Sequence, residues 1–360
     1  MGFTPALGSL FRYRLIKDIE MNSDKHVLVT GGAGYIGSHT CIGLLEAGYQ
    51  VSILDNFSNS EPGMIKRIQE ISGKSVAIYK ADIRDAGALD RIMRDNDFFS
   101  VMHFAGLKSV SESLENPAKY HNVNVIGTQI LLGAMDRHDI ESIIFSSSAT
   151  VYSGTDGTPI VETCELSPPS PYGETKVICE GIIKSYVSSS MKRAAILLRY
   201  FNPIGSHQCG LIGERPKGIP ENLMPIILEV ATGSRERLSV FGDDYDTPDG
   251  TGMRDYIHVV DLAAGHIRAL ERIEKFKGVD VFNLGTGTGY SVLEMIDVFE
   301  RTTGVTIPYE LTARRRGDLG AVIANPQKAR DILGWESNLS LSDMCKDSWM
   351  WQQTLSQLDF

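Results

Sequence analysis

The chain has 360 residues, 42% of them hydrophobic, and this predicts a substantial core in about two domains or in one large α/β domain with an appendage. The formal net charge is -10, and acidic and basic residues are mixed along the chain, which argues against a nucleic-acid groove or an anionic membrane surface as the main partner. A small anionic ligand needs only a local basic cluster and stays compatible with this balance.

Cysteine and histidine usage gives no sign of a metal site. The five cysteines are odd in number and scattered, without a CxxC spacing. They are typical of free, mostly buried thiols in a reducing compartment, so we expect a cytoplasmic protein. The eight histidines form no HExxH motif. No apolar run approaches the roughly 18 to 20 residues that span a bilayer, so we expect a soluble chain.

Residues 1–24 are interpreted as an N-terminal extension. Within it, Tyr13 and Lys17 are one helical turn apart and would share a helix face. On the order of one such pair is expected by accident in a chain with this many tyrosines. Because no glycine loop or serine-bearing strand precedes it, we interpret the pair as a coincidence. Met21 leaves an alternative start open.

Between Lys25 and about Tyr200, short β-branched runs alternate with longer helical stretches. The runs are continuously apolar, which is the pattern of parallel strands buried on both faces, with helices as the crossovers. Right-handed crossovers then give a doubly wound, Rossmann-type α/β sheet. The predicted strands are residues 26–30, 51–55, 75–79, 100–104, 142–147 and 195–200.

The first predicted strand leads directly into GGAGYIG, which opens a helical stretch. Gly31, Gly34 and Gly37 have the spacing that allows a tight turn, backbone approach to a pyrophosphate, and close packing of helix on strand. Alone the pattern is weak, since an ordinary tight turn can have it. Asp55 ends the second strand about 20 residues later, where a carboxylate accepts the ribose hydroxyls of adenosine and repels a 2′-phosphate. The sequence therefore favours bound NAD over NADP.

Two more strand ends carry candidate cofactor contacts. Asp82 and Ile83 follow the third predicted strand and are placed to meet the adenine, although Asp82 could equally cap a helix. FAGLK, residues 104–108, ends the fourth strand, and its small residues would let the backbone contact the cofactor. Lys108 suits a cofactor contact or a substrate contact.

The catalytic candidates follow the fifth predicted strand, whose serines lie at the carboxyl end of the sheet, where ligands bind in open α/β folds. Tyr172 comes about 24 residues after Ser148, where Pro171 opens a predicted helix, and Lys176 lies one turn further on the same face. An ammonium close to a phenol stabilises the phenolate and lowers its pKa from about 10 toward neutrality. We therefore predict that Tyr172 is a general acid or base.

Beyond residue 200 the alternation weakens. One helix is predicted around Leu223 to Ala231, and residues 241–252 form a long polar loop of a kind that is usually functional or flexible. VFNLG, residues 281–285, is predicted to return to the sheet. We expect a NAD-binding domain over residues 25–200, with later segments returning to it, and a smaller mixed lobe over residues 201–360.

Taken together, GGAGYIG, the strand-end Asp55, FAGLK, SSSATVY and YGETK resemble the motifs of the extended short-chain dehydrogenases/reductases. RYFNPIGSH, GIPENLMP, GTGMRDYIHVVDLA and RRRGDLG are similar to stretches of one group within them, the UDP-glucose 4-epimerase family. The resemblance covers about residues 25–350, and the combination is far more specific than any single motif.

The resemblance implies reversible interconversion of UDP-glucose and UDP-galactose with tightly bound NAD. Tyr172, helped by Ser148, would remove the proton of the sugar 4-hydroxyl, while Lys176 would hold the nicotinamide ribose. Hydride would pass from sugar C4 to NAD and return to the other face of a 4-keto sugar, without net redox. The implied cofactor contacts are Gly31, Gly34, Tyr35, Ile36, Gly37, Asp55, Asn56, Asp82, Ile83, Phe104, Ala105, Gly106, Lys108, Asn124, Tyr172, Lys176 and Tyr200.

For the UDP-sugar, the resemblance implies a second set of contacts. Two arginines suit a pyrophosphate, because each guanidinium holds phosphate oxygens with parallel hydrogen bonds, and a carboxylate can hold ribose hydroxyls. Arg315 could instead belong to a solvated basic turn. The implied substrate contacts are Lys108, Ser148, Thr150, Tyr172, Asn202, Asn222, Leu223, Arg254, Arg315, Asp318 and Val322.

The sequence departs from the family pattern at three positions. Glu221 precedes Asn222, and Val123 precedes Asn124, where either change could alter a contact. Val322 stands where a bulky tyrosine in this family resembles a gate against N-acetylated sugars, and a small residue is associated with admitting them. We therefore hypothesise activity on UDP-N-acetylglucosamine and UDP-N-acetylgalactosamine as well.

Two alternatives stay open. A sugar-nucleotide 4,6-dehydratase or decarboxylase on this scaffold needs a further acid and base, commonly an Asp-Glu pair after the fifth strand, where this chain has Ser148, Ala149 and Thr150. A regulator that binds NAD without catalysis is opposed by the intact set of Ser148, Tyr172 and Lys176. The resemblance also suggests a homodimer paired through helices after the fourth and fifth strands, and residues 115–135 are apolar enough to pack elsewhere.

Overall fold

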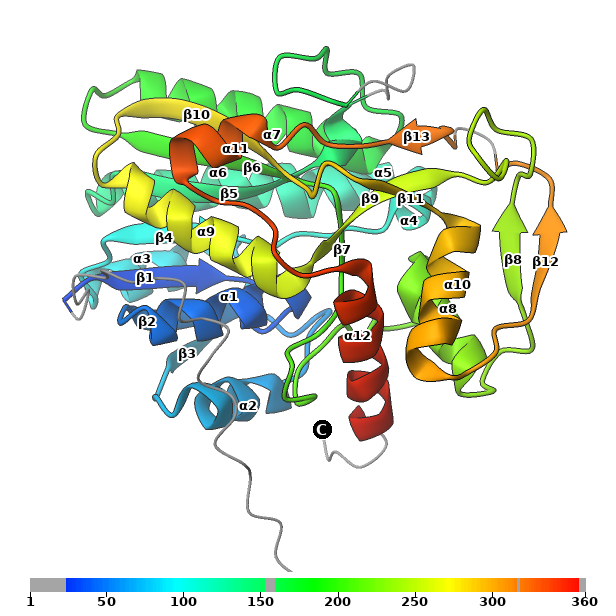
Figure 1. The fold of residues 1–360 in the computed structure, drawn as a ribbon. Coiled ribbons are helices and arrows are strands. Elements are labelled where there is room, and N and C mark those ends of the chain that lie inside the picture. The colour runs from blue at the N-terminus through cyan, green and yellow to red at the C-terminus, as the bar shows by residue number, and fades with distance from the viewer. Residues whose placement is uncertain (1–23, 153–158, 316–317, 356–360) are drawn as a thin grey trace, which may run out of the picture.

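The computed structural model describes residues 24–152, 159–315 and 318–355. A seven-stranded sheet forms its centre in the order β10-β6-β5-β4-β1-β2-β3, and every neighbouring pair is parallel (Figure 1). Each apolar run predicted as a strand corresponds to one of these strands, which confirms the doubly wound α/β fold. The strands are β1 (His26–Thr30), β2 (Gln50–Asp55), β3 (Ala77–Lys80), β4 (Ser100–His103), β5 (Ser142–Ser148), β6 (Ala194–Tyr200) and β10 (Gly278–Leu284).

Helices cover both faces of this sheet, which explains why the strands at its centre are largely apolar. In β1, Val27 and Val29 pack into the cluster on one face and Leu28 packs into the cluster on the other, because side chains alternate across a strand. The first face carries α1 (Tyr35–Glu46), α2 (Gly63–Ser72) and α9 (Val259–Ile273), and the second carries α3 (Ala86–Arg94), α6 (Gly127–Arg137) and α7 (Pro171–Ser188).

A smaller lobe lies beyond the carboxyl ends of the central strands (Figure 1). Its core is a third cluster, in which α8, α10 and α12 pack against β8 and β9. The predicted helix at Leu223 to Ala231 is confirmed as α8. The elements of the lobe are β7 (Asn202–Ile204), α8 (Leu223–Ala231), β8 (Leu238–Phe241), β9 (Met253–His258), β11 (Gly289–Ser291), α10 (Val292–Thr303), β12 (Tyr309–Thr312), β13 (Ala321–Val322) and α12 (Leu341–Leu355).

Short helical segments complete the described chain. They connect β4 to α6, β5 to α7, and β13 to α12. They are α4 (Val110–Glu115), α5 (Pro117–Tyr120), a π-helical segment (His121–Ile126), a 3-10 turn (Ala149–Val151) and α11 (Gln327–Leu333).

The order of the strands reverses between β1 and β4, since β1 is followed by β2 and β3 on one side and β4 by β5 and β6 on the other. In open α/β sheets, ligands bind outside the carboxyl ends of the strands at such a reversal. Thr30 and His103 end the two strands that flank it. The glycine loop and the FAGLK segment therefore meet at this edge.

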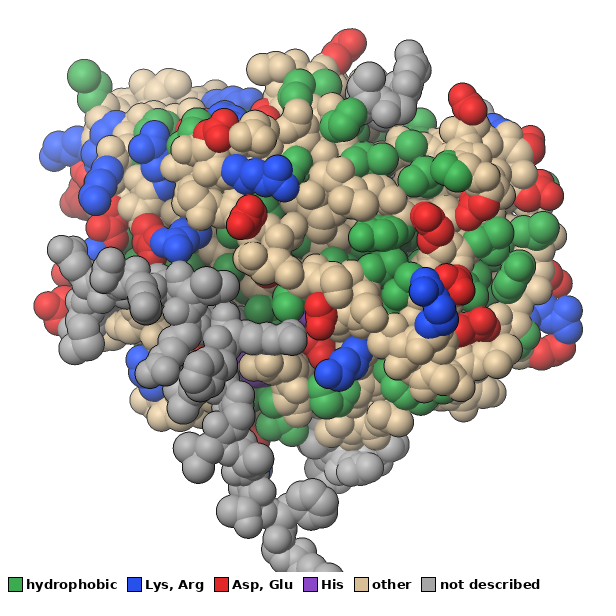
Figure 2. All heavy atoms as spheres, in the orientation of Figure 1, with side chains coloured by type: hydrophobic (Ala, Val, Ile, Leu, Met, Phe, Trp, Pro, Cys, Tyr) green, Lys and Arg blue, Asp and Glu red, His purple; other side chains and the backbone are tan. Residues whose placement is uncertain are grey.

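Figure 2 shows acidic and basic side chains interspersed over the visible face, outside the grey atoms. Among the described residues, no helix has the length and apolarity that crossing a membrane requires, and no group of three histidine, cysteine or acidic side chains is placed to hold a metal ion. Tyr13 and Lys17 lie outside the described residues.

Because four histidines are buried, we predict that the free energy of unfolding falls in mild acid. Burial lowers the pKa of His39 and His103 to about 3 and that of His207 and His266 to about 4. In the unfolded chain these histidines bind protons near pH 6.5. Their contribution to the stability of the folded protein is therefore complete above that pH and is lost as the pH falls toward 4. Glu46, whose pKa burial raises to about 7, acts in the opposite direction.

We therefore expect the free energy of unfolding, measured by urea titration, to decrease from pH 7.5 to pH 5. Each histidine contributes up to about 1.4 kcal/mol per pH unit in that window. A free energy of unfolding that is constant from pH 7.5 to pH 5 would contradict this prediction.

Candidate active site

The glycine loop lies against its neighbours so closely that side chains would not fit. Gly31 has a φ of +72°, and a Cβ built on it would lie 2.7 Å from the backbone nitrogen of Ala105. A Cβ on Gly37 would lie 2.3 Å from the carbonyl oxygen of Gly31. Helix α1 begins after Gly34 without a side-chain cap and without an acidic residue in its first turn. The N–H groups at this helix terminus therefore fit an anion such as a pyrophosphate.

Asp55 is held beside this loop by its own hydrogen bonds. Its carboxylate accepts from the Ala33 backbone nitrogen at 3.0 Å, from the Phe57 backbone nitrogen at 2.9 Å and from the Ser60 hydroxyl at 2.8 Å. A carboxylate has about four acceptor positions, so a further donor such as a ribose hydroxyl can still be bound. The side chain that the sequence assigned to the adenosine ribose is thus fixed in place next to the proposed pyrophosphate site.

Asp82 does not cap a helix, and that alternative is wrong. Helix α3 is capped by Asp85, whose carboxylate accepts from the Ala88 backbone nitrogen. Asp82 instead accepts two hydrogen bonds from the Arg84 guanidinium and one from Asn56 at 2.9 Å, and the bonds from Arg84 hold its pKa well below the ordinary range. Asn56 and Asp82, both predicted cofactor contacts, therefore meet.

Ile83 has its side chain in the core, so only its backbone can face a cofactor. The side chain is 4% exposed and packs where a Cβ on Gly127 would come within 2.5 Å of it. An adenine contact at this position therefore involves the backbone, and it stays a prediction, like the contact predicted for Asp82.

Lys108 and Asn222 are brought together by a residue that the sequence reasoning missed. The Lys108 ammonium lies 2.7 Å from a carboxylate oxygen of Glu214, and the Asn222 amide lies 3.4 Å from the same oxygen. The side chain of Glu214 is only 10% exposed. Glu221, which departs from the family pattern, accepts hydrogen bonds from Ser109, the residue after Lys108, at 2.8 and 2.9 Å. The two segments that carry Lys108 and Asn222 are therefore joined twice.

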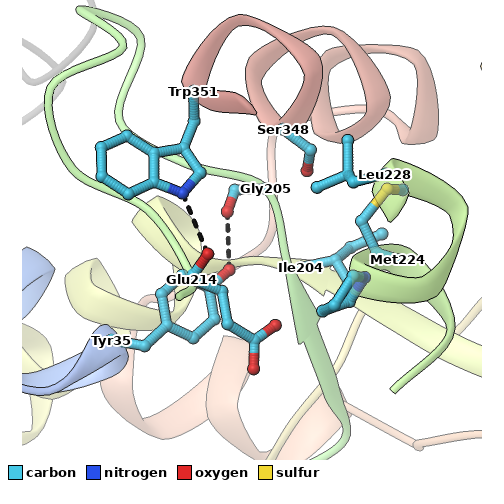
Figure 3. Close-up of a pocket in the computed structure, with 9 residues that line it drawn as sticks. Tyr35, Ile204, Gly205, Glu214, Met224, Leu228, Ser348 and Trp351 are labelled. Atoms are coloured by element: carbon cyan, nitrogen blue, oxygen red, sulfur yellow. Dashed lines mark hydrogen bonds between the residues drawn. The ribbon is translucent and has the colours of Figure 1, made fainter. Parts of the chain in front are cut away.

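The side chain of Tyr35 extends from α1 into a pocket that residues of the smaller lobe also line, as Figure 3 shows. Its hydroxyl donates to the Gly205 carbonyl at 2.7 Å, and Trp351 donates to the Glu214 carbonyl at 2.9 Å in the same pocket. At Tyr35 and Ile36, only the backbone of the first turn of α1 is available to the pyrophosphate. The phenol of Tyr35 instead links the two parts of the molecule.

Three hydroxyl groups gather where β5 meets α7. The Thr150 hydroxyl donates to Ser148 Oγ at 2.9 Å, and the Thr150 backbone nitrogen donates to the same oxygen at 3.2 Å. Ser148 also forms a hydrogen bond with the Tyr172 phenol. A Cβ on Gly173 would lie 2.5 Å from the Thr150 carbonyl oxygen, so the first turn of α7 lies directly on the segment after β5. The structure thus brings Ser148, Thr150 and Tyr172 together.

Lys176 lies one turn after Tyr172 and is 6% exposed. Its ammonium donates to the Ser146 carbonyl at 2.7 Å, and it lies 4.9 Å from the ring centre of Phe145 and 5.9 Å from that of Tyr172. Burial lowers the pKa of Lys176 to about 8.

The expected lowering of the Tyr172 pKa is not found in the structure. Burial raises the pKa of the phenol, and the hydrogen bond with Ser148 lowers it by less. The ammonium of Lys176 is directed at a backbone carbonyl, so it does not offset the loss of hydration.

Tyr200 ends β6 with its hydroxyl against His266 of α9, a residue that the sequence reasoning missed. The His266 Nδ1 lies 2.8 Å from the Leu262 carbonyl and must donate to it, so its Nε2 accepts the hydrogen bond from Tyr200. The His266 ring also lies 4.8 Å from that of Phe104. Two predicted cofactor residues, Phe104 and Tyr200, are therefore supported by one imidazole.

The arginines predicted to hold the pyrophosphate are anchored in the smaller lobe. Arg254 of β9 donates to the Leu319 carbonyl at 2.9 Å, which ties β9 to the segment after Arg315 and Asp318. Arg315 pairs with Asp318 at 2.9 Å. Its guanidinium also lies 4.6 Å from the ring centre of Phe241, and its side chain is 55% exposed.

Phe241 is an aromatic side chain that the sequence reasoning missed. It ends β8, is 37% exposed and lies at the start of the polar loop that was predicted to be functional. Its position at a strand end before that loop is the signal that could have identified it. An exposed ring beside Arg315 offers a face on which a base can stack.

Val322 of β13 lies opposite Arg254 in the parallel pairing of β13 with β9. It is partly buried against a cluster that contains Val151, Tyr152 and Phe201. Position 322 therefore lies between Arg254 and the segment that follows Ser148 and Thr150. Asn202, in β7, pairs with Tyr256 of β9, so Asn202 belongs to the same small sheet.

Comparisons with known proteins show which proteins the chain is similar to. A family model described as GDP-mannose 4,6 dehydratase matches residues 28–348. The UDP-glucose 4-epimerase of Bacillus subtilis (strain 168) is 51% identical over 328 residues, which cover 91% of this chain and 97% of that protein. The crystal structure of the UDP-glucose 4-epimerase from Stenotrophomonas maltophila, with bound NAD and formylated UDP-arabinopyranose, has a TM-score of 0.91 at 45% identity and covers 92% of this chain and 99% of that chain. The Bifidobacterium longum enzyme, in complex with NAD+ and UDP, has a TM-score of 0.88 at 47% identity and covers 92% and 98%.

The family model has the name of a dehydratase, whereas these relatives have the name of an epimerase. Elimination of water across C5 and C6 of the sugar needs a group that removes a proton from carbon. The segment after β5 offers Ser148, Ala149 and Thr150, none of which has a carboxyl group. These three residues therefore do not supply the acid and base that a dehydratase needs.

Proposed function

The chain belongs to the UDP-glucose 4-epimerase family of the extended short-chain dehydrogenases/reductases, and on this basis we propose that it interconverts UDP-glucose and UDP-galactose by inverting the sugar at C4. The observation that carries the proposal is the gathering of Ser148, Thr150 and Tyr172 at the carboxyl edge of the sheet, with Lys176 one turn further along α7. A nucleotide sugar with its C4 at this edge would present the 4-hydroxyl to Tyr172.

The residues at this edge fit NAD. The backbone of Gly31 to Gly37 would hold the pyrophosphate, because added side chains would fill the space it needs and the helix terminus behind it is uncapped. Asp55 would accept the adenosine ribose hydroxyls, and the Lys176 ammonium would reach the nicotinamide ribose. Bound NAD supplies a reversible hydride acceptor for sugar C4, so the reaction needs no net oxidant. We assign this role to residues 25–200 together with β10, and the UDP-sugar mainly to residues 201–360.

The proton of the 4-hydroxyl would be transferred by side chains of the protein, namely Ser148 and Tyr172. Ser148 Oγ receives two hydrogen bonds from Thr150, which leaves the Ser148 hydroxyl proton directed away from Thr150 and toward Tyr172 or the substrate. Ser148 thus stabilises a phenolate at Tyr172 when the phenol has given up its proton. In its phenolate form, Tyr172 takes the proton from the 4-hydroxyl in one half of the reaction, and in its phenol form it returns that proton in the other half.

Arg254 and Arg315 would hold the two phosphates of the substrate, with Phe241 beneath the uracil. The Arg315 guanidinium is bound by Asp318, and the Arg254 guanidinium is bound by the carbonyl of Leu319, the residue after Asp318. Asn222 and Lys108, joined through Glu214, would contact the phosphate and the sugar from the opposite side.

The function is tested by incubating the purified protein with UDP-galactose and, separately, with UDP-glucose. Each sugar nucleotide should yield the other, and both mixtures should reach the same ratio, as proton NMR of the anomeric signals would show. Formation of a 4-keto-6-deoxy sugar would support the dehydratase alternative. A protein that binds NAD but converts neither sugar would support the regulator.

We also propose that Val322 admits N-acetylated UDP-sugars. The partly buried valine lies between Arg254 and the segment after Ser148, where a larger side chain would enter the space next to the sugar. We expect turnover of UDP-N-acetylglucosamine by the native protein, and a loss of about 5- to 150-fold in Val322→Tyr, because overpacking beside a bound sugar costs about 1 to 3 kcal/mol. UDP-galactose turnover should change much less, and absence of N-acetylated turnover in the native protein would refute the hypothesis.

The exposed apolar side chains on α4 and α7 support a homodimer. Val110 and Leu114 on α4 and Ile178 on α7 are 40%, 63% and 41% exposed, and these two helices pack against each other. Apolar groups gathered in this way are typical of an interface. We propose a dimer through these helices, in the cytoplasm as five free cysteines favour. Multi-angle light scattering should give a dimer mass for the native protein and a smaller mass for Leu114→Asp.

A further inference from the structure

His103 is buried at the carboxyl end of β4, and both of its ring nitrogens are hydrogen bonded. Nδ1 lies 2.7 Å from the Thr30 hydroxyl, and Nε2 lies 3.0 Å from the Thr128 hydroxyl. The side chain is 2% exposed. None of the contacts assigned above to substrate or cofactor uses this imidazole.

The partners of His103 fix which ring nitrogen carries the proton. The Thr128 hydroxyl lies 2.6 Å from the Asn124 carbonyl, which can only accept, so Thr128 donates to Asn124 and must accept from His103 Nε2. His103 Nδ1 is then unprotonated and accepts from Thr30. The Thr30 hydroxyl in turn accepts from the Ala105 backbone nitrogen at 3.4 Å. The five groups form one chain of hydrogen bonds that all run in the same direction, from the Ala105 N–H to the Asn124 carbonyl.

The chain of hydrogen bonds ends at the backbone carbonyl of Asn124. The side chain of the same residue joins the FAGLK segment to α7, the helix that carries Tyr172. The Asn124 amide accepts from the Leu107 backbone nitrogen at 2.8 Å and donates to the Leu107 carbonyl at 3.1 Å. It also donates to the Thr175 hydroxyl at 3.0 Å, and Thr175 donates to the Tyr172 carbonyl at 2.7 Å. Asn124 lies in the π-helical segment His121–Ile126, a type of helix defect that is frequent at functional sites.

We propose that His103, as a neutral imidazole protonated on Nε2, is a positioning residue of the epimerisation site that sets the FAGLK segment and the first turn of α7 in a fixed relative position. It holds Ala105 through Thr30 on one side, and Asn124 through Thr128 on the other. Tyr172 and the backbone of residues 105–107 are thereby aligned on the same substrate and cofactor. The inference rests on the proposed function for its catalytic readout.

Charge on this imidazole is disfavoured. Burial lowers the pKa of His103 to about 3, and the nearby Lys176 ammonium acts in the same direction. A proton added to Nδ1 would also oppose the hydrogen bond that Thr30 donates.

Three substitutions of His103 separate the two sides of this chain of hydrogen bonds. In His103→Gln, the side-chain amide reaches toward the Nε2 position and can still donate to Thr128. In His103→Asn, it lies near the Nδ1 position and can still accept from Thr30. His103→Phe keeps a flat ring and removes both hydrogen bonds. Thr128→Val removes the acceptor of Nε2 and serves as a second route if His103→Phe does not fold. His26→Phe is the control, because His26 is bonded to Ser52 at 2.9 Å at the opposite end of β1.

The expected result is a loss of kcat with little change in KM. We expect His103→Phe and Thr128→Val to lower kcat by about 10- to 100-fold, as misplacement of a reacting group by about 1 Å does. KM should change by less than about 3-fold, and the NAD released by acid should stay close to one per chain. His103→Gln should recover more activity than His103→Asn, because it keeps the side that leads to Tyr172. The control His26→Phe should keep the native kcat.

Three results would overturn the proposal. One is a native kcat in a folded His103→Phe variant, another is equal loss in all three His103 variants, and the third is a loss that merely follows their melting temperatures. A readout independent of activity is nitrogen-15 NMR of histidine-labelled protein, assigned by the signals missing in His103→Gln. From about pH 8 to about pH 5, His103 must show a protonated Nε2 and an unprotonated Nδ1, and the opposite tautomer or an imidazolium would refute the chain. If the native protein converts no sugar, the proposed function fails instead. The spectrum then still tests whether the chain of hydrogen bonds through His103 exists.

Discussion

Tyr172→Phe should lower kcat for the interconversion of UDP-galactose and UDP-glucose by about 10²- to 10⁴-fold, the range that a positioned acid or base contributes. The substitution removes one oxygen from a side chain that is 9% exposed and whose ring packs edge-on against Tyr120 at 6.5 Å. The ring stays, so the fold and the bound NAD should stay as well. The measurement is steady-state kinetics of the variant together with its melting temperature and its content of acid-released NAD.

Tyr186→Phe is the matched control for this experiment. Tyr186 lies near the end of the same helix, and its hydroxyl donates to the Ile140 carbonyl at 3.1 Å, away from the carboxyl edge of the sheet. We expect its kcat to stay within about twofold of the native value. A native kcat in Tyr172→Phe, or an equal loss of kcat in Tyr186→Phe, would show that Tyr172 does not transfer the proton.

The second large effect concerns a buried ion pair on the helix that carries Tyr172. Glu180 and Arg199 are 1% and 2% exposed, and they are joined by two hydrogen bonds of 2.9 and 2.6 Å. Glu180 also accepts from Ser147 at 2.7 Å, and Arg199 donates to Tyr152 at 2.8 Å. Because removal of one partner leaves the other charge buried and unpaired, Glu180→Gln should lower the free energy of unfolding by about 3 to 5 kcal/mol.

An exposed pair is the control for the buried one. Asp297 and Arg301 are 2.7 Å apart on α10, and their side chains are 64% and 69% exposed. Asp297→Asn should lower the free energy of unfolding by at most about 0.5 kcal/mol, since solvent screens such pairs. Removing both buried charges in Glu180→Met with Arg199→Met should cost less than the sum of the single changes. Equal effects of Glu180→Gln and Asp297→Asn in urea titrations would contradict the assignment.

The central sheet could be predicted from the sequence because its signals are local. A strand buried on both faces needs apolar residues at consecutive positions, and β1, with Val27, Leu28 and Val29 all at 0% exposure, shows why. The glycine loop could be predicted because its signal is local as well. The positive φ of Gly31 and the close approach of Gly37 to the Gly31 carbonyl oxygen both require glycine.

What the sequence did not predict depends on contacts between distant segments. Glu214 lies more than a hundred positions after Lys108, which it binds, and no spacing rule relates them. The pKa of Tyr172 was expected to fall on account of Lys176, but burial dominates, and burial is a property of the packed molecule. His103 was passed over because a lone histidine at a strand end has no pattern. Its role follows from Thr30 and Thr128, which packing brings to its two nitrogens.

The most direct test of the account follows the hydrogen on C4 of the sugar. Purified protein is incubated with UDP-galactose that carries deuterium at C4, without added cofactor or reductant, and the UDP-glucose formed is examined by mass spectrometry and NMR. The deuterium should be found at C4 of UDP-glucose, because the same hydrogen leaves and returns within the site. Replacement of the label by solvent hydrogen, or a product that accumulates in an oxidised state and needs a reductant to proceed, would contradict it.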